Sequence, residues 1–302
     1  MSPRVLAALG GALAVGVAIA IVITHRNKQT APPPPPTTTS SATTAPSPTT
    51  TAPPPTTTTQ PAPPPPPAAV PMSWDNAGAI VWHSSDVDPT WLGQTLRAAN
   101  FGWVAVYLPP DPNWMYRFRL ASGLPIGGWS VLGDHPGYEA GLATRLVRKY
   151  GLAFYIADAE QPYADVPSRS STFVRVFRRD QPSLPAGLSS LCIANALDLT
   201  AWAGGRFAFL PQAYVNDFGS GVDPVNCANT AQAIFGRANV HPTVASYAGT
   251  FGRVAPARFV RLLALAGTTG FSVYPAEVAM SSEDWQAYGD AITSLHIATE
   301  VR

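Results

Sequence analysis

The chain has 302 residues, which is enough for one large domain with additional segments at its ends. Its 19 Lys and Arg nearly balance 18 Asp and Glu, so the net charge of +1 gives no indication of a nucleic-acid partner. The 2 cysteines, Cys192 and Cys227, are too few for a disulfide-stapled scaffold or a cysteine-rich zinc site, and the sequence predicts neither a metal nor another cofactor. In an exported protein they can form one disulfide bond; two unpaired thiols are the alternative, because Cys192 lies in an apolar run typical of a core.

An uninterrupted apolar stretch lies near the start of the chain, over residues 5–23. It is long enough for a helix to cross a hydrocarbon core of about 30 Å. Arg4 precedes the stretch and Arg26 and Lys28 follow it, with no clear cleavage site of small residues behind it. Residues 1–28 are therefore predicted to be an uncleaved, single-pass membrane anchor; a cleaved signal peptide, which gives a secreted protein, is the alternative.

A segment rich in Pro, Thr, Ser and Ala follows over residues 29–73. It has no hydrophobic periodicity and too few large apolar side chains to offset the entropy lost on ordering, so it is predicted to be a disordered linker. Its proline runs favour extended polyproline II structure, which rises about 3.1 Å per residue. Stalks of this composition are common outside cells, so we expect the following domain to be extracytoplasmic and held at the cell membrane.

Strand and helix patterns alternate through residues 74–302, which are predicted to form one domain. The expected strands lie at 79–83, 102–108, 125–131, 151–160, 188–194, 207–214, 243–247 and 270–274. The expected helices lie at 88–99, shortly after 112, and at 137–150, 170–178, 227–236, 256–266 and 281–297. This count and length predict an α/β fold, a (β/α)8 TIM barrel. An open doubly wound sheet is the alternative, but no glycine-rich phosphate loop follows the first strand.

The fourth expected strand carries two acids at its end. Asp158 and Glu160 are two positions apart, so on a strand they point to the same side, about 6.5–7 Å apart along the backbone. Crowding two carboxylates at the rim of a sheet raises the proton affinity of one of them, which is what acid–base chemistry needs. An ion pair with a neighbouring arginine or a helix cap is the alternative explanation.

The ends of the other strands carry aromatic, amide and hydroxyl side chains. In a TIM barrel the working face lies at the carboxyl ends of the strands. Flat aromatic rings with amides and carboxylates suit a sugar, whose apolar ring faces stack while its hydroxyls form hydrogen bonds; the alternative is that the aromatics only fill the barrel. The predicted substrate-binding residues are Trp82, His83, Trp129, Gln212, Asn216, Tyr247, Tyr274 and Glu277. Ser84, Tyr107 and Asn195 also fall at expected strand ends.

Two short motifs resemble the glycoside hydrolase barrels of the chitinase and GH25 lysozyme type. They are Asp158-Ala159-Glu160 at the fourth strand and Gln212-Ala213-Tyr214-Val215-Asn216 at the sixth. The resemblance implies that Glu160 is the general acid, that Asp158 helps to orient a substrate N-acetyl group, and that Tyr214 contacts the same group. These three are the predicted catalytic residues.

The sequence therefore leads to two function hypotheses. The first is a membrane-tethered glycoside hydrolase-like enzyme acting on an N-acetylated cell-envelope polysaccharide such as peptidoglycan. The second is a barrel that binds glycan, or is structural, without catalysis. The longer acidic run that chitinases carry before the Asp is absent here, where Tyr155 and Ile156 stand instead, and this favours the second hypothesis.

Overall fold

The computed structural model describes residues 71–192, 197–277 and 280–300, with side chains up to Leu295 in the last segment. The predicted membrane anchor and nearly all of the predicted stalk lie outside these residues. None of the helices in the described part is long and apolar enough to cross a bilayer.

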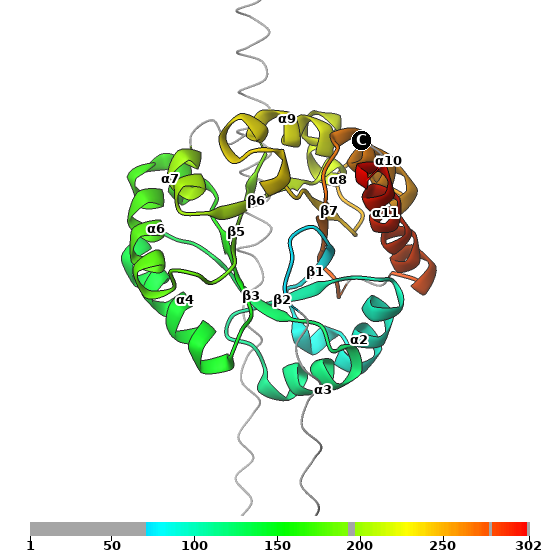
Figure 1. Cartoon of the computed structure of the whole chain (residues 1–302), viewed down its shortest axis with the longest axis horizontal. Helices are drawn as coiled ribbons and strands as arrows, with labels where there is room; N and C mark the ends of the chain where they lie inside the picture. The colour runs from blue at the N-terminus through cyan, green and yellow to red at the C-terminus, as the bar shows by residue number, and fades with distance from the viewer. Residues whose placement is uncertain (1–70, 193–196, 278–279, 301–302) are drawn as a thin grey trace, which may run out of the picture. The chain divides into compact units, whose positions relative to one another are not determined.

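Eight parallel strands form a closed barrel in the order β1 to β8, with β8 hydrogen-bonded to β1. This confirms the predicted TIM barrel over the open-sheet alternative, and Figure 1 shows the strands at the centre with the helices around them. The strands are β1 (Ala77–Val81), β2 (Trp103–Tyr107), β3 (Ile126–Val131), β4 (Tyr155–Asp158), β5 (Ala186–Leu191), β6 (Phe207–Ala213), β7 (Thr243–Ala245) and β8 (Phe271–Tyr274).

Helices connect the strands, and several begin where an aspartate precedes a proline. Asp88 accepts hydrogen bonds from the backbone of Thr90 and Trp91, and Asp111 and Asp223 cap their helices in the same way. The α-helices are α2 (Pro89–Ala98), α3 (Pro112–Ser122), α4 (Pro136–Tyr150), α5 (Gln161–Asp165), α6 (Ser168–Asp180), α7 (Leu199–Gly204), α8 (Val215–Phe218), α9 (Pro224–Phe235), α10 (Pro256–Ala266) and α11 (Ser282–Glu300). The short helices α5, α7 and α8 were not expected, because single turns carry too little periodicity to be recognised.

Side chains alternate between the inside and the outside of the barrel along each strand. On β4, Tyr155 packs outward against Phe173 and Phe177 of α6, while Ile156 belongs to the cluster that fills the barrel. Below Ile156, the rings of Trp103 and Phe154 occupy the interior. Glycines make room for these rings: a Cβ at Gly78 would lie 2.1 Å from Trp103, and one at Gly127 would lie 2.2 Å from Phe154. The amino-terminal half of the barrel is therefore a packed aromatic core.

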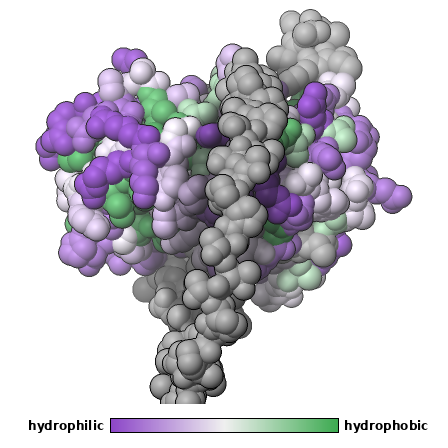
Figure 2. Space-filling view, turned by 90° about the horizontal axis from the view of Figure 1, so that it is seen from below, coloured by the Kyte–Doolittle hydropathy of each residue, from purple (hydrophilic) through white to green (hydrophobic). Residues whose placement is uncertain are grey.

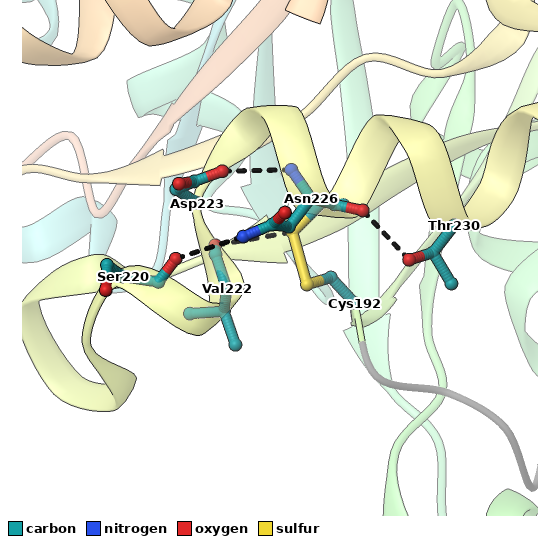
Figure 3. Close-up of a disulfide and its surroundings, with 7 residues drawn as sticks. Cys192, Ser220, Val222, Asp223, Asn226 and Thr230 are labelled. Carbon is teal, nitrogen blue, oxygen red and sulfur yellow. Dashed lines mark hydrogen bonds between the residues drawn. A yellow bond between two sulfur atoms is a disulfide. The ribbon is translucent and has the colours of Figure 1, made fainter.

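A disulfide bond joins Cys192, directly after β5, to Cys227 on α9 (Figure 3). Of the two alternatives left by the sequence, a disulfide bond or two unpaired thiols, the structure has the disulfide bond, with the two Cα atoms 4.9 Å apart. Hydrogen bonds hold the start of α9 beside the bridge, where Asp223 accepts from the backbone of Asn226 and the Asn226 side chain donates to the Ser220 carbonyl. The bridge closes a loop that contains all of β6.

The face of the domain seen in Figure 2 carries polar and apolar side chains side by side. In the view of Figure 2, hydrophobic residues form small separate patches among polar ones. Exposed apolar side chains that are scattered in this way are normal for a folded domain.

Candidate functional site

The two predicted catalytic acids lie at the carboxyl end of β4. Asp158 is the last residue of the strand and follows Phe154 and Ile156 on the inward-facing side, so its carboxylate lies inside the barrel, 2% exposed. Glu160 comes two residues later, at the start of α5, and is half-buried. Its side chain makes no capping hydrogen bond to that helix, so the helix-cap explanation does not describe it.

Gln212 of β6 connects the two acids. Its Nε2 donates to Oδ1 of Asp158 at 2.8 Å and to Oε1 of Glu160 at 3.2 Å. An amide nitrogen donates hydrogen bonds and a carboxyl oxygen accepts them, so Nε2, and not the amide oxygen, is assigned to the side of the two acids. One buried amide group thus holds both carboxyl groups within hydrogen-bond reach of the same atom.

Two serines of β5 complete this cluster. The hydroxyl of Ser189 lies 3.2 Å from Nε2 of Gln212, and Ser190 donates to the carbonyl of Ala159, between the two acids. Neither serine was predicted, because the fifth strand was expected to run to 194, whereas it ends at Leu191, so both serines lie near its carboxyl end. In the observed register, Gly187 and Ser189 occupy the positions of β5 that face into the barrel. This alternation of inward and outward positions could have identified Ser189 from the sequence.

Six aromatic side chains lie next to one another at the carboxyl end of the barrel. Tyr107 and Trp82 stack with centroids 5.9 Å apart, and both contact Trp129 edge to face. Tyr274 lies 5.8 Å from Trp129 and stacks on Tyr214 at 5.8 Å. We call Trp82, Tyr107, Trp129, Tyr214, Tyr247 and Tyr274 the mouth aromatic cluster.

The members of the mouth aromatic cluster differ in exposure. Trp129 is 3% exposed, with its indole N–H bonded to the carbonyl of Val81, and Tyr214 is 5% exposed. Tyr107 is 36% exposed, and Trp82 is half-buried. Trp129 and Tyr214 therefore fill the top of the barrel, as one alternative expected, whereas Tyr107 and Trp82 remain partly accessible to a ligand, as the other expected.

Asn216 lies behind this surface. It is fully buried, its side-chain nitrogen donates to the Tyr247 carbonyl, and its Oδ1 has no hydrogen-bond partner within the described part of the chain. The Tyr247 hydroxyl donates to the carboxylate of Asp217, so a second hydrogen bond links the segment after β6 to the segment after β7. Asn216 thus supports the loop after Tyr214, and its full burial keeps it from solvent in this conformation.

Glu277 fastens the last strand to the first. Its carboxylate accepts hydrogen bonds from the backbone N–H groups of Trp82, at 3.0 Å, and His83, at 3.0 Å. Burial raises the pKa of Glu277, and these two donors oppose the shift. The His83 side chain is exposed beside Trp82. Asn195 falls at 193–196, outside the described residues.

The site can therefore provide two carboxylates, an amide, hydroxyls and aromatic faces. The described residues contain no group of three or more His, Cys, Asp or Glu side chains placed to hold a metal ion. The arrangement suits proton transfer to a ligand with many hydroxyls and apolar ring faces.

The closed (β/α)8 barrel defines the structural class, and solved structures of the same class resemble it. No family model and no curated protein matches the chain. A chitinase from Chromobacterium violaceum is 14% identical with a TM-score of 0.53, over 73% of this chain and 99% of that one. A class V chitinase from Nicotiana tobaccum is 11% identical with a TM-score of 0.55, over 72% and 98%. The PgaB glycoside hydrolase domain from Bordetella bronchiseptica is 9% identical with a TM-score of 0.52, over 72% and 98%. At such identities the similarity concerns the fold.

Proposed function

We propose that the protein is a membrane-tethered, extracytoplasmic glycoside hydrolase-like enzyme that acts on an N-acetylated cell-envelope glycan such as peptidoglycan. The observation that carries the proposal is the Asp158–Gln212–Glu160 arrangement beside the mouth aromatic cluster. The two motifs that resemble chitinases and the chitinase-like fold support it.

In this proposal Glu160 donates the proton to the glycosidic oxygen. It is the less buried of the two acids, so a substrate can reach it, whereas Asp158 lies deeper and is held by Gln212. Most glycoside hydrolases use two carboxyl groups on the enzyme, but some use the N-acetyl group of the substrate in place of one of them. An N-acetylated glycan suits this substrate-assisted mechanism. Asp158 and Tyr214 would then orient the acetamido group, with Glu160 as general acid.

The extracytoplasmic location rests on two further observations. The apolar stretch at 5–23 and the Pro/Thr-rich segment at 29–73 fit an anchor and a stalk. The Cys192–Cys227 disulfide fits an oxidising compartment, where such bonds form and persist.

The test is Glu160→Gln in the full-length chain, assayed for release of soluble sugar from peptidoglycan and, in parallel, for co-sedimentation with it. We expect at least about 100-fold less turnover, because a general acid contributes about that factor or more, with unchanged binding. Glu283→Gln, an exposed acid on α11, is the control and keeps full activity. Turnover that survives in Glu160→Gln would remove Glu160 from the acid role.

A glycan-binding barrel without catalysis is the second candidate. One observation favours it: Ile156, the inward residue below Asp158, belongs to the apolar interior, so no third carboxylate lies beneath the pair on β4. Wild-type protein that sediments with the glycan but releases no sugar from any N-acetylated polymer would establish this alternative.

A further inference from the structure

A groove lined by three arginines lies away from the mouth of the barrel. Its walls are α6 from Ser171 to Arg178, the loop after this helix, and α7 with the two residues that precede β6, and its volume is about 430 Å³. We call it the arginine groove. It is lined by Ser171, Val174, Arg175, Arg178, Pro182, Ala201, Gly204, Gly205 and Arg206.

Arg178 is a fixed cation in this groove. Its guanidinium donates to four backbone carbonyls, those of Gln181, Leu184, Gly205 and Arg206, and lies 4.5 Å above the ring of Phe207. Burial and then the charge of Arg206 lower the pKa of Arg178 to about 10, so the group stays charged at neutral pH. Its immobility means that a ligand would not have to order it.

Arg175 and Arg206 add two more charges, both on exposed side chains. Arg206 has φ 58°, a left-handed conformation that is unfavourable for a residue with a Cβ, and it follows Gly205. Among the described residues, no ion pair joins any of these three arginines to a carboxylate. Three guanidinium groups therefore line one concave surface with no carboxylate partner in the described part of the chain, and those of Arg175 and Arg206 are the exposed ones.

We propose that the arginine groove binds a phosphate group. Guanidinium groups match the oxygen geometry of phosphate and form charge-assisted, often bidentate, hydrogen bonds with it. The groove is next to the amino-terminal ends of β5 and β6, whereas Asp158, Glu160 and Gln212 are at carboxyl ends. A ligand in the groove thus occupies a second site, independent of the proposed glycan site. The phosphate can be free or belong to a phosphodiester such as a lipid headgroup.

Calorimetric titration of the full-length protein in detergent tests the proposal. One titration uses inorganic phosphate and the other uses glycerophosphoglycerol, a soluble phosphodiester, which distinguishes the two sources. We expect saturable binding of at least one probe that weakens as salt is added. The variant Arg175→Gln/Arg206→Asn should lower its affinity by about tenfold or more, because each charge-assisted bond contributes strongly. Asn is used at 206 because it tolerates a left-handed backbone.

The matched control is Arg258→Gln/Arg261→Gln, which removes two exposed charges from α10. It should bind like the wild type, and both variants should show the same cooperative thermal unfolding. Arg178 is left intact, since its removal would break the contacts of two loops. The proposal is overturned if neither probe binds the wild type, if the groove variant binds normally, or if the control loses as much affinity as the groove variant.

Discussion

Gln212 on β6 reaches past β5 to the carboxylate of Asp158 on β4, with 2.8 Å between Nε2 and Oδ1. Both side chains are nearly inaccessible to solvent, at 3% and 2%. A hydrogen bond between two buried polar groups matters because water cannot replace either partner once the other is removed.

Replacement of Gln212 by Ala should therefore destabilise the barrel. We expect the free energy of unfolding to fall by about 1–3 kcal/mol, the cost of leaving a buried polar group without its donor. Urea unfolding of the wild type and the variant measures this free energy. The control is Gln286→Ala, at an exposed glutamine on α11, which should change stability by less than about 0.5 kcal/mol. In a double-mutant cycle, Gln212→Ala and Asp158→Asn should be coupled; strict additivity would contradict the interaction.

Substitutions of Trp129 and Tyr107 should distinguish the residues of the mouth aromatic cluster that stabilise the fold from those that contact a ligand. Trp129→Ala should cost about 3–5 kcal/mol of stability, as for other buried aromatic residues. Tyr107→Ala should cost much less and instead weaken co-sedimentation with the glycan. Tyr116→Ala, an exposed tyrosine on α3, is the control that should affect neither. Normal glycan binding by Tyr107→Ala would exclude that ring from the ligand surface.

His241 should make the fold sensitive to acid. Burial lowers its pKa to about 4 from 6.5, and the nearby charge of Asp75 opposes the shift only in part. The unfolded chain thus binds the proton more readily, so stability is intact above pH 6.5 and is lost as the pH falls towards 4. This loss amounts to about 3 kcal/mol at full extent.

The variant His241→Gln should show a flatter dependence of unfolding free energy on pH over this range. His135→Gln is the matched control, because the His135 side chain is 78% exposed. Equal pH profiles for wild type and His241→Gln would show that His241 does not cause the acid sensitivity.

The variant Cys192→Ala/Cys227→Ala should unfold at lower urea concentration. The residues are 35 apart in sequence, and closing a loop of that length stabilises a fold by about 4 kcal/mol in the chain-entropy model. Because the chain has only these 2 cysteines, a reductant should lower the stability of the wild type and leave the variant unchanged. A wild type that resists reductant under unfolding conditions would contradict this expectation.

The strand positions were predictable because each strand is an apolar run bounded by turn residues, as around Tyr155 and Phe207. Alternation along the predicted strand 151–160 placed Asp158 and Glu160 on one side, whereas β4 ends at Asp158 and Glu160 directly precedes α5. Contacts across the barrel were not predictable, since nothing in the local pattern shows that Gln212 bonds to both acids. Glu277 was predicted to bind substrate, and only the closed β1–β8 seam reveals that its carboxylate holds the backbone of Trp82.

The Cys192–Cys227 bridge also affects how the protein is best produced in the laboratory. Expression in a reducing bacterial cytosol would yield the dithiol form, in which no covalent bond holds the segment around β6 and only its packing and hydrogen bonds remain. Since Gln212 and Tyr214 belong to that segment, preparations made with and without an oxidative step should differ first at the carboxyl end of the barrel.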